Sequence, residues 1–194
     1  MSRPQCSVYI ATSVDGFIAR PDGGLDWLDR VQVEGEDYGY AEFFGSIDAI
    51  VFGRSTWEVA RGFEPWPYAG RRCIVLTHRE LDASHGEERH HGDLEPLLER
   101  LHGEGVRRVY VDGGQVIRHF LAGGLVDDLT LSIVPVLLGE GIPLFASGGP
   151  GLDLRLLESR AFPSGLVQLR YARASSTGNL VPSARPSDHG ANAG

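Results

Sequence analysis

The sequence predicts an α/β domain of three layers (α/β/α), with a central mixed, mostly parallel sheet and a C-terminal antiparallel hairpin. Three observations favour this fold class. Short apolar runs alternate with helical patterns as far as Gly123-Gly124, which is typical of parallel strands joined by helices. Beyond that point only strand patterns occur. The last two, residues 154–161 and 166–172, flank a turn at 162–165 whose proline and glycine predict a hairpin.

The first half of the chain predicts three short apolar strands, at residues 7–13, 49–52 and 73–76. Gly, Pro and Asp are frequent in residues 14–24, which predicts a loop. Helical patterns occupy residues 25–30, 38–46 and 55–61. Residues 78–92 are polar and predict a further loop.

The second half begins with a helix whose start is well marked. Asp93 is a suitable N-cap, and Pro96 fits the first turn. A strand at 106–111 and a helix at 115–121 follow. The apolar segment 129–138 predicts a long strand, and its proline indicates a bulge or a sheet edge. We expect this strand to contribute to a homodimer.

Length and composition indicate one domain with a flexible tail. The 194 residues suffice for one domain of ordinary size at 1–174, followed by a C-terminal tail at 175–194 that is rich in Ser, Gly, Pro and Asn. The net charge of −8 argues against nucleic acid and anionic membranes as partners. No segment reaches the roughly 18 apolar residues of a membrane span, and no secretion signal is visible, so we expect a cytoplasmic protein.

Cysteines and histidines predict no metal site. Cys6 and Cys73 lie in apolar strands, where buried, inert thiols are expected, and two cysteines cannot form a thiolate zinc site. The histidines between residues 85 and 102 have no carboxylate or thiolate at ligand spacing. We therefore expect no bound metal.

A first glycine turn follows the strand at 49–52. Gly53 ends the strand, Arg54 adds a positive charge, and Ser55 and Thr56 add hydroxyl groups at a helix start. Glycine lets a phosphate approach the backbone, and the N–H groups of a helix start can bind it. All 18 basic residues are Arg, so any phosphate must be bound by Arg, backbone or hydroxyl groups. A capped helix without a ligand is the alternative.

A second glycine turn, Asp112-Gly113-Gly114, follows the strand at 106–111, and Gln115 and Val116 begin the next helix. A double glycine allows the backbone to approach a ligand or a neighbouring strand. Its spacing matches neither the Rossmann fingerprint nor a P-loop, and a tight turn without a ligand is the alternative. Two such turns in one domain indicate a nucleotide bound between them, and hence a cofactor-dependent enzyme.

Other polar residues near strand ends and turns extend this hypothesis. Thr77 and Arg79 follow the strand at 73–76, where Arg79 suits a ribose phosphate or simply lies in a solvated loop. The acidic candidates are Asp15, Asp22, Asp26 and Asp37. A carboxyl group beside an apolar cleft can hold an aminopyrimidine edge and help to deliver a proton, although Asp near turns commonly acts as a cap.

Together these segments resemble the dihydrofolate-reductase-like superfamily, especially the branch that contains the riboflavin-pathway reductase domain. The resemblance covers roughly residues 6–173. Its motifs occur in family order at residues 11–19, 24–27, 48–58, 111–114, 124–129 and 135–145. Each motif alone has low specificity, whereas their common order and spacing are specific.

The resemblance implies an NADPH-dependent reductase with the cofactor phosphates held from two sides. The pyrophosphate and 2′-phosphate would be bound by Gly53, Arg54, Ser55 and Thr56. Thr77 and Arg79 would line the adenosine end. The remaining phosphates would be bound by Gly113, Gly114, Gln115 and Val116. Ala11 and Ile18 would flank the nicotinamide. Because relatives typically have a cis peptide at this glycine pair, we expect one at Asp112-Gly113 or Gly113-Gly114.

The substrate side is less well defined by the resemblance. Counting back from Gly53, the pteridine-binding carboxylate of dihydrofolate reductases corresponds to Asp37, which is expected on a helix beside the cleft. Asp37 is thus the first candidate for the catalytic acid, and Asp26 is the second. The riboflavin branch holds a sugar phosphate with basic residues near the first loop, where this chain offers only Arg20 and Arg30.

We therefore expect hydride transfer from NADPH to a pterin- or aminopyrimidine-type heterocycle. The model reactions are those of 5-amino-6-(5-phosphoribosylamino)uracil reductase in riboflavin biosynthesis and of dihydrofolate reductase. The expected partners are a small heterocyclic substrate and a second copy of the chain. One alternative is a non-catalytic nucleotide-binding module on the same fold, and another is a purely structural protein.

Overall fold

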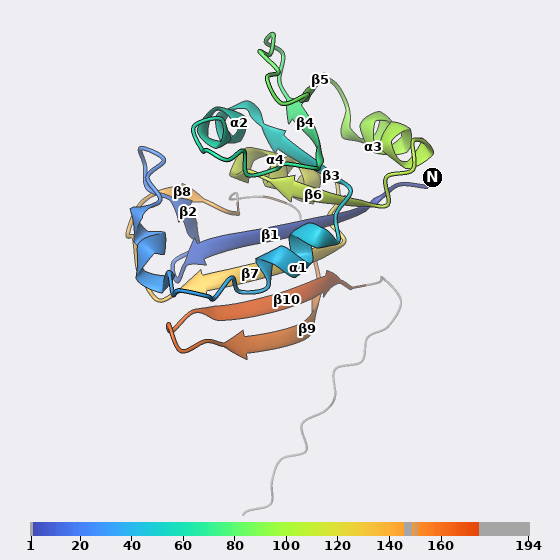
Figure 1. Cartoon of the computed structure of the whole chain (residues 1–194). Helices are drawn as coiled ribbons and strands as arrows, with labels where there is room; N and C mark the ends of the chain where they lie inside the picture. The colour runs from blue at the N-terminus through green and yellow to red at the C-terminus, as the bar shows by residue number, and fades with distance from the viewer. Residues whose placement is uncertain (1, 146–148, 150, 175–194) are drawn as a thin grey trace, which may run out of the picture.

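The main sheet of the computed structural model has eight strands (Figure 1), and the structure describes residues 2–145, 149 and 151–174. In chain order these strands are β1 (Gln5–Ser13), β3 (Ala49–Gly53), β4 (Arg72–Leu76), β5 (Glu88–His90), β6 (Arg108–Asp112), β7 (Asp128–Val134), β9 (Leu154–Ala161) and β10 (Val167–Arg173). Across the sheet the order is β5-β4-β3-β6-β1-β7-β10-β9. A separate pair joins β2 (Phe17–Ala19) to β8 (Ile142–Pro143).

The sheet is mixed and mostly parallel, which confirms the predicted fold class. β1 runs parallel to β6 and β7, and β3 runs parallel to β4 and β6. β10 pairs antiparallel with both β7 and β9, so the last two strands form the expected C-terminal hairpin. The carboxyl ends of β4, β3, β6 and β1 consequently meet at one edge of the sheet, where ligands of open α/β folds bind.

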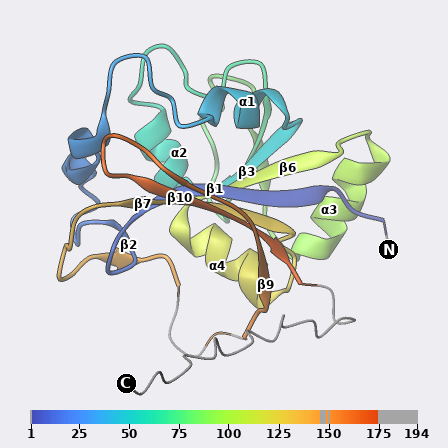
Figure 2. The same ribbon diagram turned by 90° about the horizontal axis from the view of Figure 1, so that it is seen from below.

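Helices cover both faces of the sheet. They are the 3-10 helix η1 (Asp26–Val31) and the α-helices α1 (Tyr40–Gly45), α2 (Arg54–Ala60), α3 (Leu94–Gly103) and α4 (Gly114–Ala122). Successive residues of β3 point to opposite faces. Val51 belongs to the core formed with α3 and α4, whereas Ile50 and Phe52 belong to the core formed with α1 and α2. Figure 2 shows α1 and α2 on the side of the sheet opposite to α4.

Some elements differ from the sequence prediction. β7 ends at Val134 rather than at residue 138, because Pro135 follows it and has no N–H for the strand ladder. β5 lies inside the segment predicted to be a loop, since a three-residue edge strand is too short to show an apolar alternation. The tail expected at 175–194 lies outside the described residues. Within the part of the chain that the structure describes, the helices are too short or too polar to cross a membrane.

The position of β7 bears on the expected homodimer. β7 lies between β1 and β10, so both of its edges are already paired. The outer strand is β9, all of whose residues are exposed, including Leu154, Leu156 and Leu157. An exposed apolar edge strand is a ready surface for pairing with another chain. A homodimer stays a prediction, and the apolar surface available for it lies on β9 rather than on β7.

A buried hydrogen bond fixes α2, the helix that begins with the first glycine turn. Trp57 is 1% exposed and packs in the core beneath α2. Its indole Nε1–H donates to Glu87 Oε1 at 2.8 Å. Glu87 Oε2 accepts the backbone N–H of His85 at 2.8 Å. Burial acts to raise the pKa of Glu87, but these hydrogen bonds outweigh it, and the pKa lies below its ordinary value of 4.5.

Removal of the hydrogen bond between Trp57 and Glu87 should destabilise α2. Glu87→Ala leaves the Trp57 indole without its acceptor, and we expect the free energy of unfolding to fall by about 1–3 kcal/mol.

The lowered pKa of Glu87 predicts a dependence of stability on pH. The charged carboxylate contributes stability above its unfolded pKa of 4.5, and this contribution is lost as the pH falls through the folded pKa. The stability difference between wild type and Glu87→Gln should therefore shrink below about pH 4.5 in denaturant titrations. Glu99→Gln, at an exposed position of α3, is the control and should show no such trend.

Candidate functional site

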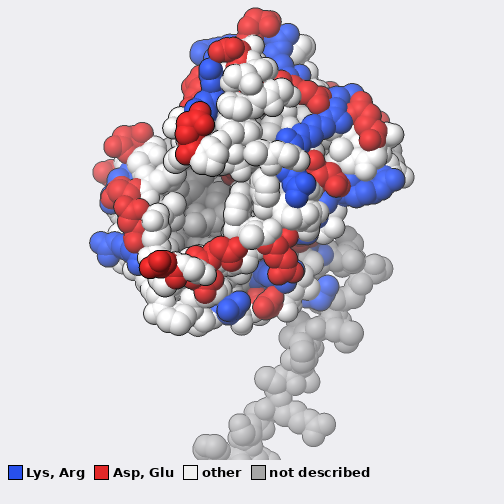
Figure 3. Space-filling model, in the orientation of Figure 1, with Lys and Arg blue, Asp and Glu red and all other residues white. Residues whose placement is uncertain are grey.

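A cleft of about 1120 Å³ lies at the carboxyl ends of β1, β3, β4 and β6. Its walls come from these strand ends, from the first turns of α2 and α4, and from η1. Figure 3 shows this hollow on the face in view, with a mostly uncharged lining. Both glycine turns border the cleft. The volume exceeds the about 300–1,000 Å³ of ordinary small-ligand pockets, so there is room for a dinucleotide beside a second small molecule.

The two glycine turns are in direct contact. Gly113 has a φ of 86°, a conformation that favours glycine. A Cβ atom at Gly113 would collide with Thr56 Oγ1 and would lie 3.9 Å from the backbone nitrogen of Gly53. On the other side of the contact, a Cβ at Gly53 would lie 3.3 Å from Val116 Cγ2. The turns therefore form one continuous wall of the cleft, and the space beside them is open.

Ile18 closes this wall from the side of β2. A Cβ atom at Gly114 would collide with Ile18 Cδ1, so the side chain of Ile18 lies directly against the second glycine turn. Ile18 and Ala11 both line the cleft. Arg118 Nη1 donates to the carbonyl of Pro143 at 2.6 Å and thereby links α4 to β8, the partner strand of β2.

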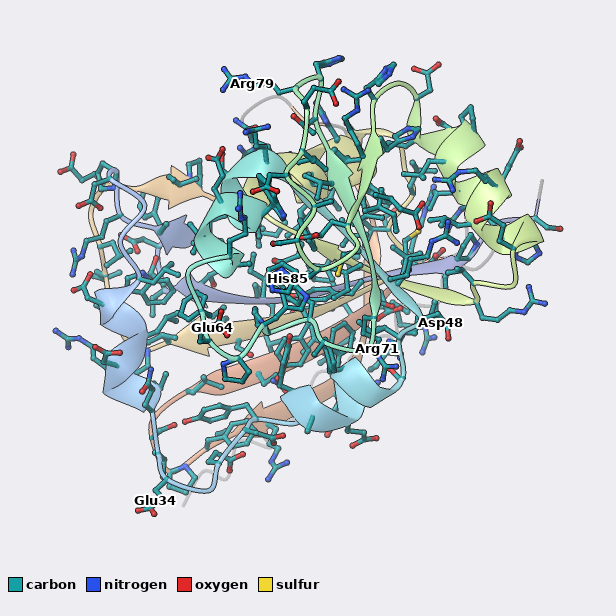
Figure 4. All side chains as sticks on the ribbon, turned by 45° about the horizontal axis from the view of Figure 1, so that its top comes forward. Glu34, Asp48, Glu64, Arg71, Arg79 and His85 are labelled. Atoms are coloured by element: carbon teal, nitrogen blue, oxygen red, sulfur yellow. The ribbon has the colours of Figure 1, made fainter. Side chains whose placement is uncertain are left out.

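The structure brings nearly all of the predicted cofactor residues together. The cleft is lined by Ala11, Ile18, Gly53, Arg54, Ser55, Thr56, Thr77, Gly113, Gly114, Gln115 and Val116. Arg79 is the exception, because it lies outside the lining and extends from the loop after β4 (Figure 4). Its backbone N–H donates to Thr77 Oγ1 at 3.1 Å.

Arg54 is held in place at the mouth of the first glycine turn. Its Nε donates to Glu58 Oε1 at 2.7 Å, and its Nη1 donates to the carbonyl of Glu80 at 3.0 Å. Among the described residues Nη2 has no hydrogen-bond partner. The guanidinium is thus oriented by protein contacts while one of its nitrogens remains available to a ligand.

The prediction of a cis peptide bond at the glycine pair is wrong. In the described residues the cis peptide is Glu64-Pro65, and the bonds from Asp112 to Gly114 are trans. The positive φ of Gly113 reverses the chain with trans peptides, which glycine permits without a Cβ clash.

The two predicted catalytic carboxylates lie outside the cleft lining. Asp37 precedes α1 rather than lying on a helix, and it is exposed. It accepts the N–H groups of Ala41 and Gly39, each at 2.9 Å, and these bonds lower its pKa. Asp26 accepts two hydrogen bonds from Arg20, which lower the pKa of Asp26. In this structure Asp37 acts as a helix cap and Asp26 as an ion-pair partner.

Besides Asp93 and Glu95 at the start of α3, Asp112 lines the cleft from the end of β6. It accepts the Tyr68 hydroxyl at 2.9 Å and the Gly113 N–H at 2.8 Å. Burial raises the pKa of Asp112 above its ordinary value of 3.8, although these hydrogen bonds oppose the shift. Strand alternation could have indicated it, because Asp112 follows Tyr110 on the face that packs towards α1 and α2.

The end of the cleft near η1 is apolar and aromatic. Tyr9, Ala11, Trp27 and Leu28 contribute to it. Trp27 is 1% exposed, and its buried Nε1–H has no hydrogen-bond partner among the described residues. Ala11 and Trp27 belong to the motifs at 11–19 and 24–27, whereas Tyr9 and Leu28 match an ordinary core pattern, and only the fold collects all four in one cleft.

In the described residues, the cysteines and histidines do not form a metal site. Burial raises the pKa of both Cys6 and Cys73 to about 12, as expected of inert thiols. Within the described ranges, no group of three His, Cys, Asp or Glu side chains could hold a metal ion.

Comparisons with known proteins agree with the fold. Residues 4–168 match the family model of the RibD C-terminal domain. YwjB of Bacillus subtilis (strain 168) is 35% identical over 171 residues, which are 86% of this chain and 97% of YwjB. A solved structure from Shewanella sp. PV-4, whose name refers to riboflavin biosynthesis, has a TM-score of 0.83 and 32% identity. The match covers 88% of this chain and 99% of the Shewanella chain.

A shorter match concerns a protein with a named reaction. The 2,5-diamino-6-ribosylamino-4(3H)-pyrimidinone 5′-phosphate reductase of Methanothermobacter thermautotrophicus is 37% identical over 79 residues. These residues are 38% of this chain and 37% of that protein. The resemblance to the riboflavin-pathway reductase branch is thereby confirmed.

The contact between the two glycine turns predicts how a substitution at Gly113 changes stability. Gly113→Ala combines an unfavourable positive φ with a collision against Thr56, and we expect a loss of about 1–3 kcal/mol in the free energy of unfolding. Gly103→Ala is the matched control, because nothing lies within 4 Å of its added Cβ. Thermal unfolding of both variants measures the difference. Equal stability of the two variants would contradict the described contact.

Proposed function

Because the chain belongs to the RibD C-terminal domain family, we propose that it is an NADPH-dependent reductase of a pterin- or aminopyrimidine-type heterocycle. The family is the reductase domain of riboflavin biosynthesis. The observation that carries the proposal is the joined wall of the two glycine turns beside an open cleft. We retain a cytoplasmic location and a homodimer as parts of the proposal.

The residues of the wall fit the cofactor. Gly114 is the first residue of α4, so its backbone N–H makes no hydrogen bond within that helix and can donate to a phosphate. The hydroxyls of Ser55 and Thr56 and the N-terminus of α4 add donors. Arg54 supplies a charge for the 2′-phosphate that distinguishes NADPH from NADH. When bound, NADPH would supply a hydride for the reduction.

The chain itself would contribute a side chain that donates a proton to the substrate from a fixed position. Reduction of a C=N or C=O bond needs a proton at the heteroatom in addition to a hydride at carbon. Asp112 lies in the cleft, and its raised pKa keeps the carboxyl protonated to a higher pH than an ordinary Asp. Tyr68 and the Gly113 N–H hold the carboxyl in one orientation. We assign the proton to Asp112 in place of Asp37 and Asp26.

Arg54 should discriminate between the two nicotinamide cofactors. Arg54→Ala removes a charge-assisted bond to the 2′-phosphate, and we expect NADPH affinity to fall about tenfold or more while NADH affinity changes little. Arg61→Ala is the control, because Arg61 lies at the other end of α2, pairs with Asp82 and does not line the cleft. Titration calorimetry measures both cofactors. Equal losses for NADPH and NADH would remove Arg54 from this role.

Asp112→Asn tests whether Asp112 donates the proton. The amide keeps the size of the side chain but cannot deliver a proton, so turnover should fall on the order of 10²-fold while NADPH still binds. Wild-type turnover should decrease as pH rises through the raised pKa of Asp112, and the variant should lack this decrease. NADPH oxidation is followed by absorbance with a panel of pterins and aminopyrimidines.

Asp37→Asn is the comparison and should keep wild-type turnover. Loss of turnover in Asp37→Asn, with Asp112→Asn unaffected, would return the catalytic role to Asp37. Binding of NADPH without oxidation by any member of the panel would favour the alternative, a non-catalytic nucleotide-binding module.

A further inference from the structure

Two histidines lie close together at the carboxyl ends of β4 and β5. Leu76 of β4 pairs with His90 of β5, and the backbone N–H of Thr77 donates to the carbonyl of His90 at 2.9 Å. Because these strands are parallel, the chain leaves both of them at the same edge of the sheet. His78 and His91 follow there, and the centroids of their rings lie 6.0 Å apart. We call these two side chains the histidine pair.

The histidine pair is accessible from the cleft. Both side chains line the cleft, and both are exposed. Within the described part of the chain, the imidazoles that form hydrogen bonds are those of His85 and His90, so both rings of the pair are free to donate to a ligand. The planes of the two rings are tilted by 35° from each other.

The loop after β4 connects the histidine pair with Arg54. Nη1 of Arg54 donates to the carbonyl of Glu80 at 3.0 Å, two residues beyond His78. Across the sheet β5, β4 and β3 are neighbours in that order, and Arg54 follows β3 directly. Three adjacent strand ends therefore bring His91, His78 and Arg54 to one side of the cleft. An anion bound by the free Nη2 of Arg54 would lie beside the loop that carries His78.

Charges of both signs surround the histidine pair. The charged and titratable side chains of the neighbouring elements are Arg54 and Glu58 of α2, Arg79 and Glu80 of the loop, Arg89 and His90 of β5, Asp93 and Glu95 at the start of α3, and Arg118 and His119 of α4. Glu58 is paired with Arg54 at 2.7 Å, and Glu80 is paired with Arg89 at 2.5 Å. All of these groups are present with and without a ligand. A change in the charge of the pair on binding therefore has to come from the ligand.

A phosphate group is a ligand that could cause such a change. A histidine side chain changes its charge between about pH 5 and pH 8, and two protonated rings 6.0 Å apart repel each other. A phosphate dianion beside both rings offsets this repulsion and accepts an N–H from each of them. Charge-assisted bonds of about 2.7–2.9 Å from two rings at this spacing can converge on one phosphate. Binding of the phosphate and binding of protons by the pair then favour each other.

We propose that the histidine pair binds the 2′-phosphate of NADPH together with Arg54, and that the chain takes up a proton when this cofactor binds. The proposal rests on the proposed function, which assigns NADPH to the cleft and its 2′-phosphate to Arg54. It adds that the preference for NADPH over NADH depends on pH. The preference is strong where the imidazoles are protonated and weaker where they are neutral. Arg54 stays charged throughout this range and supplies the remaining preference.

Titration calorimetry of the full chain with NADP⁺ and NAD⁺ tests the proposal, because these probes differ only in the 2′-phosphate. We expect the affinity for NADP⁺ to fall about tenfold or more between about pH 6.5 and pH 8.5, while the affinity for NAD⁺ changes less than about twofold. The phosphate itself remains mainly a dianion over this range, since its second pKa is about 6. An affinity ratio of the two probes that does not change with pH would overturn the proposal.

Proton uptake provides a second readout. The heat of binding at about pH 7.5, measured in buffers of different ionisation enthalpy, gives the number of protons bound with each probe. We expect about 0.5 protons or more per NADP⁺ and almost none per NAD⁺. Equal uptake with both probes, or no uptake with NADP⁺, would contradict the proposal.

Substitutions of the pair localise the effect. The double variant His78→Gln, His91→Gln keeps side chains that can donate hydrogen bonds but cannot be protonated. It should lose the pH dependence and the proton uptake with NADP⁺, and it should bind NAD⁺ like the wild type. His91→Arg introduces a permanent cation and should bind NADP⁺ with a smaller pH dependence. His102→Gln is the control, because His102 lies on α3 outside the cleft lining, and it should behave like the wild type.

The variants also distinguish the 2′-phosphate from other parts of the cofactor. Equal losses of affinity for NADP⁺ and NAD⁺ in the double variant would place the rings against the shared adenosine or pyrophosphate and would overturn the proposal. Unchanged pH dependence in the double variant would do the same. Thermal unfolding without ligand should be similar for all variants, since the substituted side chains of the pair are exposed.

The binding data separate this proposal from the proposed function. If neither NADPH nor NADP⁺ binds to the wild type, the proposed function fails. If NADP⁺ binds more tightly than NAD⁺ by the same factor at every pH and without proton uptake, only the role of the histidine pair is contradicted.

Discussion

The close approach of two backbone turns is the constraint on which the rest of the site depends. Gly113 packs against Thr56 so tightly that no side chain fits between them, and its positive φ independently favours glycine. This contact joins the ends of β3 and β6 into one wall of the cleft. The buried bond from Trp57 to Glu87 fixes α2 behind the wall, and Ile18 closes it from β2. The stability of the fold and the shape of the site therefore depend on the same contacts.

The wall also divides the cleft into two chemically different ends. Arg54 and several histidine side chains line the cleft towards β4 and α4, together with Asp93 and Glu95, and the phosphates of a dinucleotide would lie there. Apolar and aromatic side chains gather towards η1, and the segment outside them is acidic. Asp112 lies between these ends, at the last residue of β6.

Local sequence patterns predicted those features that local structure determines. Glycine at the ends of β3 and β6 indicated both turns, and apolar alternation indicated most strands of the sheet. The position of Asp37 was not predictable in this way, because counting residues from Gly53 cannot reveal that Asp37 precedes α1 and caps it. The apolar end was missed for a related reason. Tyr9 matches an ordinary core pattern, and Trp27 was given no role within the motif at 24–27, because only tertiary packing brings the two to one cleft.

Amide hydrogen exchange of the chain with and without NADPH tests the central claim most directly. If the phosphates are bound between the two turns, NADPH should slow exchange at residues 53–56 and at residues 113–116 together. Exchange in β9, on the far side of the sheet from the cleft, should stay unchanged in a monomer. Protection at one turn without the other, or at neither, would contradict the account.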